Sequence, residues 1–133
     1  MSIIITQIKT SSENKERVTR LTRKFGLGAE NVIARIAIAY SLKSGRHFSP
    51  LEVKDSGGKE YSRSVLFGNM FPLYLAMICS HYNIKGTDKN LARYFKMHLD
   101  DGLERIDCDV KDNPNLVGFD YLFDKIEEGL KEL

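Results

Sequence analysis

Histidines and carboxylates are the side chains in this sequence that could carry out chemistry, and their spacing decides which chemistry. His47, His81 and His98 are isolated, and none stands four residues from another histidine in a zinc-binding pattern. Acidic side chains crowd one later stretch, consisting of Asp100, Asp101, Glu104, Asp107 and Asp109. Such a cluster could hold Mg²⁺ for a nuclease, but a solvated helix face is the simpler interpretation.

Two glycine-containing segments also lack the spacing of a nucleotide-binding loop. They are Gly26-Leu27-Gly28 and the segment from Asp55 to Lys59. The sequence therefore predicts no catalytic residue, no metal ligand and no cofactor.

Basic side chains form the clearest pattern that remains. Lys15, Arg17, Arg20, Arg23 and Lys24 crowd one predicted helix. Arg17, Arg20 and Lys24 are three and four residues apart, so they line one helical face. Arg offers a planar fork to phosphate oxygens and Lys a point charge, which makes a phosphate backbone a suitable ligand. A merely solvated face remains the alternative.

Charge is distributed unevenly along the 133 residues. Residues 1–63 carry a net charge of +6 and residues 64–133 a net charge of −4, although the total is only +2. With 42% hydrophobic and 29% charged residues, we expect one folded domain over residues 1–133. The apolar stretches are too short or too broken to span a bilayer, and residues 1–5 do not resemble a signal peptide. We expect a cytoplasmic protein in which Cys79 and Cys108 are reduced.

Hydrophobic periodicity predicts a mainly α protein with a short N-terminal strand. We expect the strand over residues 3–9, with a partner strand that another copy could supply. Thr10 and Glu13 fit a capping box before a helix over residues 12–25, and Gly26 ends that helix. A second helix should cover residues 29–43, and residues 44–64 should form a mobile connector in which Ser49-Pro50-Leu51-Glu52 could start a short helix.

The later part of the chain should be helical as well. Residues 72–82 are apolar on nearly every side, which predicts the central buried helix. A further helix over residues 89–101 should be interrupted or bent at Gly102 before residues 103–110. The last helix is expected from about residue 119 to the end. The order strand, basic helix, glycine turn, helix also resembles ribbon-helix-helix DNA binders, in which two copies pair their strands.

Several blocks of residues closely resemble the DndE family of DNA sulfur modification proteins. They include Ile8-Lys9-Thr10-Ser11, the segment from Leu21 to Ala37, the segment from Asp55 to Tyr61, Ile78-Cys79-Ser80-His81-Tyr82 and the segment from Met97 to Leu103. The resemblance spans nearly the whole chain, which makes it more specific than any short motif above.

The resemblance implies a small non-catalytic protein of the machinery that replaces a non-bridging phosphate oxygen of DNA with sulfur. It implies a homotetramer that prefers nicked double-stranded DNA, in a system of the restriction-modification kind. It also implies partners: a cysteine desulfurase, an adenylating sulfurtransferase and an ATPase. The Gly26–Gly28 turn matches the glycine-rich segment of the family and should help to set the geometry of assembly.

The leading hypothesis is therefore that an oligomer holds DNA through its basic surface. The predicted DNA-binding residues are Lys9, Lys15, Arg17, Arg20, Arg23, Lys24, Arg46, Lys54 and Lys59. The predicted oligomerisation residues are Ile4, Ile8, Gly26 and Gly28. The alternatives are a nicking endonuclease that uses the Asp100–Asp101 cluster, an adaptor that assembles the sulfur-transfer enzymes through its acidic half, and an operator-binding ribbon-helix-helix regulator.

Overall fold

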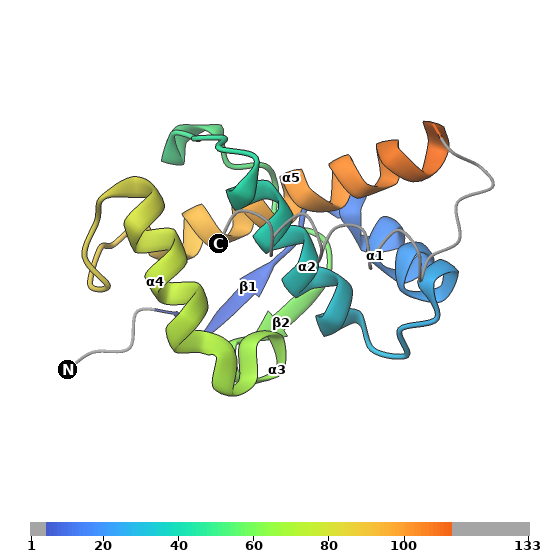
Figure 1. The fold of residues 1–133 in the computed structure, drawn as a ribbon, viewed down its shortest axis with the longest axis horizontal. Helices are drawn as coiled ribbons and strands as arrows, with labels where there is room; N and C mark the ends of the chain where they lie inside the picture. Colours follow the sequence, from blue (N-terminus) through green and yellow to red (C-terminus); the bar gives the residue numbers. More distant parts are fainter. Residues whose placement is uncertain (1–4, 113–133) are drawn as a thin grey trace.

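Helices dominate the computed structural model, which describes residues 5–112 (Figure 1). The strands are β1 (Gln7–Lys9) and β2 (Glu60–Ser62), and the α-helices are α1 (Ser12–Phe25), α2 (Glu30–Lys43), α3 (Arg63–Phe67), α4 (Phe71–Tyr82) and α5 (Leu91–Asp112). Two short 3-10 helices, η1 (Pro50–Glu52) and η2 (Gly68–Met70), complete the order. The expected mainly α fold with a short N-terminal strand is confirmed. The predicted last helix, from residue 119, and Ile4 lie outside the described residues.

The strand at the N-terminal end pairs within its own chain. β1 and β2 are antiparallel, with Ile8 opposite Tyr61. Both of these side chains are buried, while their neighbours on the two strands are exposed. This pairing corrects the expectation that another copy supplies the partner strand. It also places β2 inside residues 44–64, which were predicted to form a mobile connector.

The first helix begins one residue later than the predicted capping box implies. Ser11, and not Thr10, is the N-cap, and its Oγ accepts a hydrogen bond from the backbone N–H of Asn14. Thr10 is buried and its Oγ1 accepts from Lys59 N, so it fastens the segment before β2 to β1. Gly26 ends the helix in the left-handed conformation at φ 64°, as predicted.

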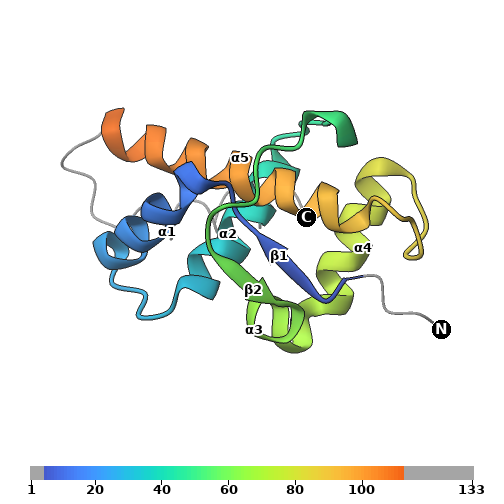
Figure 2. The same cartoon turned by 180° about the vertical axis from the view of Figure 1, so that it is seen from behind.

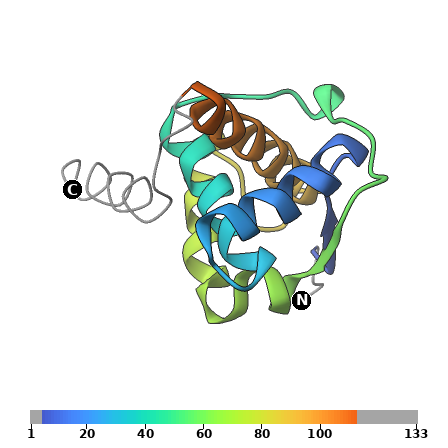
Figure 3. The same cartoon turned by 90° about the vertical axis from the view of Figure 1, so that its right-hand side faces the viewer.

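The longest helix, α5, forms the centre of the fold. It packs against α2 and α1 in every view (Figures 1, 2 and 3), and Phe95, Leu99, Leu103 and Ile106 are fully buried in the shared core. The helix runs through Gly102 without a break, which corrects the predicted interruption. A Cβ at Gly102 would clash with the backbone oxygen of Ala37, so this glycine allows α5 and α2 to approach closely.

Helix α4 lies at the edge of the molecule, which corrects the prediction that residues 72–82 form the central helix. Tyr74 and Ile78 are its buried side chains, and Leu73 remains 54% exposed. Residues Arg63–Tyr82 are long and apolar enough to count as one candidate membrane span. A single span of this kind is weak evidence for a membrane protein, because the core helix of a soluble protein passes the same test. The segment is divided among α3, η2 and α4, and the 12 residues of α4 extend only about 18 Å, against about 30 Å of bilayer hydrocarbon.

Candidate nucleic-acid interface

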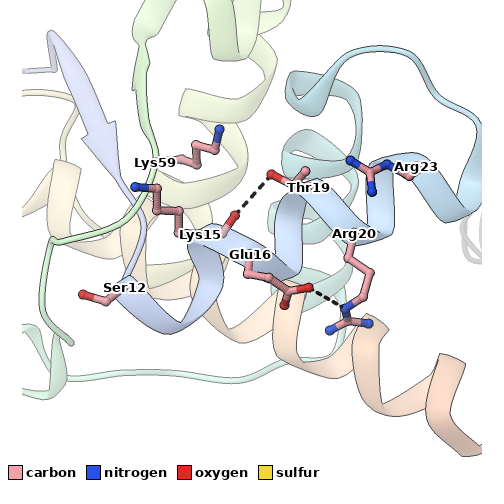
Figure 4. Close-up of a pocket in the computed structure, with 7 residues that line it drawn as sticks. All are labelled: Ser12, Lys15, Glu16, Thr19, Arg20, Arg23 and Lys59. Carbon is pink, nitrogen blue, oxygen red and sulfur yellow. Dashed lines mark hydrogen bonds and ion pairs between the residues drawn. The ribbon is translucent and has the colours of Figure 1, made fainter.

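An open groove of about 550 Å³ runs along α1 and is the candidate interface (Figure 4). Its lining residues are Ser12, Lys15, Glu16, Thr19, Arg20, Arg23 and Lys59. Lys15, Thr19 and Arg23 are four residues apart in turn, so they follow one side of the helix, and Lys59 reaches the same side from the segment before β2. The lining therefore has four cations and one carboxylate.

Three cations of α1 have no ion pair among residues 5–112. They are Lys15, Arg23 and Lys24, and all three are exposed. Lys15 and Arg23 line the groove itself. Their positive charge is not offset by a contacting carboxylate in this part of the chain, which suits them to an external anion.

Arg17 and Arg20 have a different environment, because both bind the carboxylate of Asp107 on α5. Arg17 Nε lies 2.8 Å from Asp107 Oδ2, and Arg20 Nη1 lies 2.8 Å from Asp107 Oδ1. Asp107 is almost fully buried, and the hydrogen bonds from Arg20, aided by Arg17 and opposed by burial, hold its pKa well below the usual range. The predicted row of Arg17, Arg20 and Lys24 is therefore divided, with two members fixed to the body of the protein.

The remaining predicted DNA-binding residues also have internal partners. Lys9 pairs with Glu60 at 3.6 Å and Lys59 with Glu30 at 3.6 Å. Arg46 pairs with Asp101, and Lys54 pairs with Glu104. Arg46 follows α2 and Lys54 follows η1. Neither residue lines the groove.

The acidic stretch of α5 provides internal contacts. Asp100 accepts hydrogen bonds from the backbone N–H of Ser11, from Asn14 Nδ2 and from Lys96 Nζ. Lys96 Nζ also donates to two backbone oxygens, those of Lys9 and Asp55, so its three N–H groups are satisfied. Within residues 5–112 no group of three His, Cys, Asp or Glu side chains is arranged to hold a metal ion. Sequence reasoning identified the cluster, but its role in anchoring α1 and β1 depends on tertiary contacts.

The three histidines are close together in space, which their positions in the sequence did not indicate. The rings of His47 and His81 are stacked with centroids 4.0 Å apart, and His81 and His98 meet edge to face at 5.3 Å. His98 is fully buried. Burial, with a smaller effect from His81, lowers the pKa of His98 to about 4.

The hydrogen bonds of His98 fix its tautomer. Ser41 Oγ donates its proton to Asp101 Oδ2 at 2.6 Å, so the 2.7 Å contact with His98 requires His98 Nδ1 to donate. His98 Nε2 then accepts from the hydroxyl of Tyr82 at 2.6 Å. Ser41 is fully buried and gives its proton to the carboxylate rather than to the imidazole. The order of these groups differs from that of a nucleophilic triad, in which histidine lies between serine and the acid.

The predicted oligomerisation residues occupy different environments. Ile8 is buried in the core of its own chain. Gly26 and Gly28 both have positive φ, 64° and 79°, and a Cβ at either position would meet no described atom within 4 Å. The thiols of Cys79 and Cys108 are free.

The fold and the groove define a small, mainly helical protein whose first helix presents an exposed cationic surface. A family model described as "DNA sulphur modification protein DndE" matches residues 7–113, and the chain therefore belongs to the DndE family.

A solved structure shares this fold. The crystal structure of DndE from Escherichia coli B7A, described as involved in DNA phosphorothioation modification, superposes with a TM-score of 0.63 at 19% sequence identity. The match covers 74% of this chain and 94% of that chain. The curated proteins include no significant match.

Proposed function

We propose that this protein is a non-catalytic DNA-binding component of the DNA phosphorothioation machinery, and that the groove along α1 holds the phosphate backbone of a duplex. The observation that carries the proposal is the exposed pair Lys15 and Arg23, which line the groove and have no ion pair among residues 5–112. Membership of the DndE family supplies the pathway.

The dimensions of the cationic side suit a duplex. Lys15 and Arg23 are separated by eight residues of helix, or about 12 Å along the axis of α1 at ~1.5 Å per residue. Duplex DNA carries a negative charge for about every 1.7 Å of its axis, so both cations can reach phosphates of one bound segment. Contacts of this kind position a protein on DNA without reading its sequence. Backbone binding is therefore the form of recognition that the groove supports.

The proposal extends to the context of binding. The resemblance to DndE proteins supports a preference for nicked DNA, a homotetrameric assembly, a cytoplasmic location and action beside the sulfurtransferase, the ATPase and the cysteine desulfurase of the pathway. A nick breaks the phosphodiester backbone of one strand, so the duplex bends there at lower cost and can follow a short protein surface more closely.

A binding role also fits the internal contacts of the acidic residues. Asp100, Asp101 and Asp107 accept hydrogen bonds from side chains that hold the fold together. A nuclease that used them for Mg²⁺ would have to break these contacts. Incubation of supercoiled plasmid with purified protein and Mg²⁺ should leave the plasmid uncut, and cutting that survives further purification would contradict the non-catalytic proposal.

Charge reversal in the groove tests the DNA-binding role. The double variant Lys15→Glu, Arg23→Glu should bind both intact and nicked duplex at least tenfold more weakly than the parent in a gel shift. The matched control is Lys85→Glu, Lys89→Glu, which reverses two exposed cations between α4 and α5. Equal weakening of the two double variants, or no weakening of the first, would remove the groove from the interface.

A further inference from the structure

An exposed apolar surface lies at the end of the molecule away from the groove. We define it by Val65 of α3, Met70 of η2 and Leu73 of α4, which are 57%, 44% and 54% exposed. We call it the α3–α4 surface. In Figures 1 and 2, α4 and α1 stand at opposite ends of the long axis of the molecule.

The helical spacing of α4 explains why apolar side chains remain uncovered. Tyr74 and Ile78 are four residues apart and point into the core, which leaves the side that contains Leu73 and Ala76 exposed. The burial of Phe67 against Phe71, Tyr74 and Phe95 fixes α3 and α4 in this arrangement. Clustered large apolar side chains on the outside of a protein are typical of interaction surfaces.

The chain segment that forms this surface carries no carboxylate. The chain has no acidic residue between Glu60 and Asp88. Arg63 lies over the ring of Phe71, 5.0 Å from its centroid, and Arg35 donates to the backbone oxygen of Leu66 on α3 at 3.3 Å. An apolar centre with arginines at its margin complements a partner that has apolar side chains flanked by carboxylates.

We propose that the α3–α4 surface docks an amphipathic helical segment of another protein whose apolar stripe is bordered by Asp or Glu. Such a helix would place its apolar side chains on Val65, Met70 and Leu73 and its carboxylates near Arg63 and Arg35. The surface is separate from the α1 groove, so one molecule can contact this partner and an anionic polymer at the same time.

A pair of synthetic helical peptides provides the probe. Both carry leucines at alternating three- and four-residue spacing, with glutamates beside the stripe in one peptide and lysines in the other. Fluorescence anisotropy with the full chain should show at least tenfold tighter binding of the glutamate peptide. Leu73→Asp should weaken that binding at least tenfold, whereas Leu51→Asp, at a 90% exposed position on η1, should leave it unchanged.

Several results would overturn this inference. They are equal binding of the two peptides, no binding of either, or equal effects of Leu73→Asp and Leu51→Asp. Loss of a larger species on sedimentation of Leu73→Asp, without peptide binding by the parent, would assign the surface to a second copy of this chain. Capture of the parent by phosphatidylcholine vesicles, without peptide binding, would assign it to lipid. Leu73 is exposed, so its variant should keep the parent circular dichroism and DNA affinity, which separates this test from that of the groove.

Discussion

Asp107 is the residue that divides the cations of α1 into two groups. Its carboxylate binds Arg17 and Arg20 and also lies 3.4 Å from Lys111 Nζ. Helical spacing alone predicted Arg17, Arg20 and Lys24 on a common face of one helix. It could not reveal that a carboxylate about 90 residues later meets two of them, because that contact depends on how α1 packs on α5. The groove cations Lys15 and Arg23 were among the predicted residues, but nothing in the sequence distinguished them from the paired ones.

Removal of the Asp107 charge should therefore strengthen DNA binding. Asp107→Asn removes the buried carboxylate that holds Arg20, which lines the groove and then keeps only its pair with Glu16. It also leaves Arg17 without its nearest carboxylate. We expect severalfold tighter duplex binding and a steeper salt dependence. The control Asp109→Asn removes the same charge at a carboxylate that accepts from Tyr40, outside the α1 contacts. If the two variants have the same DNA affinity, Asp107 does not restrain the groove arginines.

His98 should make stability depend on pH in a defined window. Its pKa is about 4 in the folded protein, because burial disfavours the charged ring, and near 6.5 when unfolded. The unfolded chain thus binds the proton first, and stability is complete above pH 6.5 and falls as the pH drops toward 4. The full difference is about 3 kcal/mol. Urea unfolding at several pH values should show this loss in the parent and a smaller loss in His98→Gln; equal losses would show that His98 is not responsible.

Helices α1 and α2 were predictable from sequence, whereas α4 was wrongly expected at the centre of the fold and α5 was wrongly expected to be interrupted or bent at Gly102. The amphipathic spacing of Val18, Leu21 and Phe25 and the Gly26 cap are local signals, and the structure follows them. Helix α4 is more apolar than α5, so composition favoured it as the central helix. Its position at the edge becomes clear only when the polar contacts of Asp100, Asp107 and Lys96 are seen to hold α5 in the core.

The crossing of α2 and α5 depends on the absence of a side chain at Gly102. Gly102→Ala would force the backbone of Ala37 to move, and we expect a loss of about 2–3 kcal/mol in the free energy of unfolding, as for other overpacked core positions. Gly86→Ala is the control, because a Cβ there meets Leu75 at an ordinary 3.6 Å. Thermal unfolding of both variants measures the difference. A Gly102 variant as stable as the parent would show that the two helices can separate without cost.

At the scale of the whole molecule, the sequence correctly indicated an uneven charge distribution but not which charges reach the surface. The basic half contributes the cations of the groove, while several carboxylates of the acidic half are used inside the fold, including Asp100 and Asp107. The surface at the opposite end exposes apolar side chains and has Arg63 and Arg35 near it. The proposed functions of the two ends, DNA binding at α1 and partner docking at α3–α4, follow from this arrangement.

The salt dependence of DNA affinity tests the central claim most directly. Each phosphate contact contributes about 0.9 to the slope of log affinity against log salt concentration, because binding releases condensed counterions. Fluorescence anisotropy of a nicked duplex, titrated at several salt concentrations, should give a steep slope for the parent. The slope should become shallower by about two for Lys15→Glu, Arg23→Glu and remain at the parent value for Lys85→Glu, Lys89→Glu. Identical slopes for all three proteins would contradict DNA binding in the α1 groove.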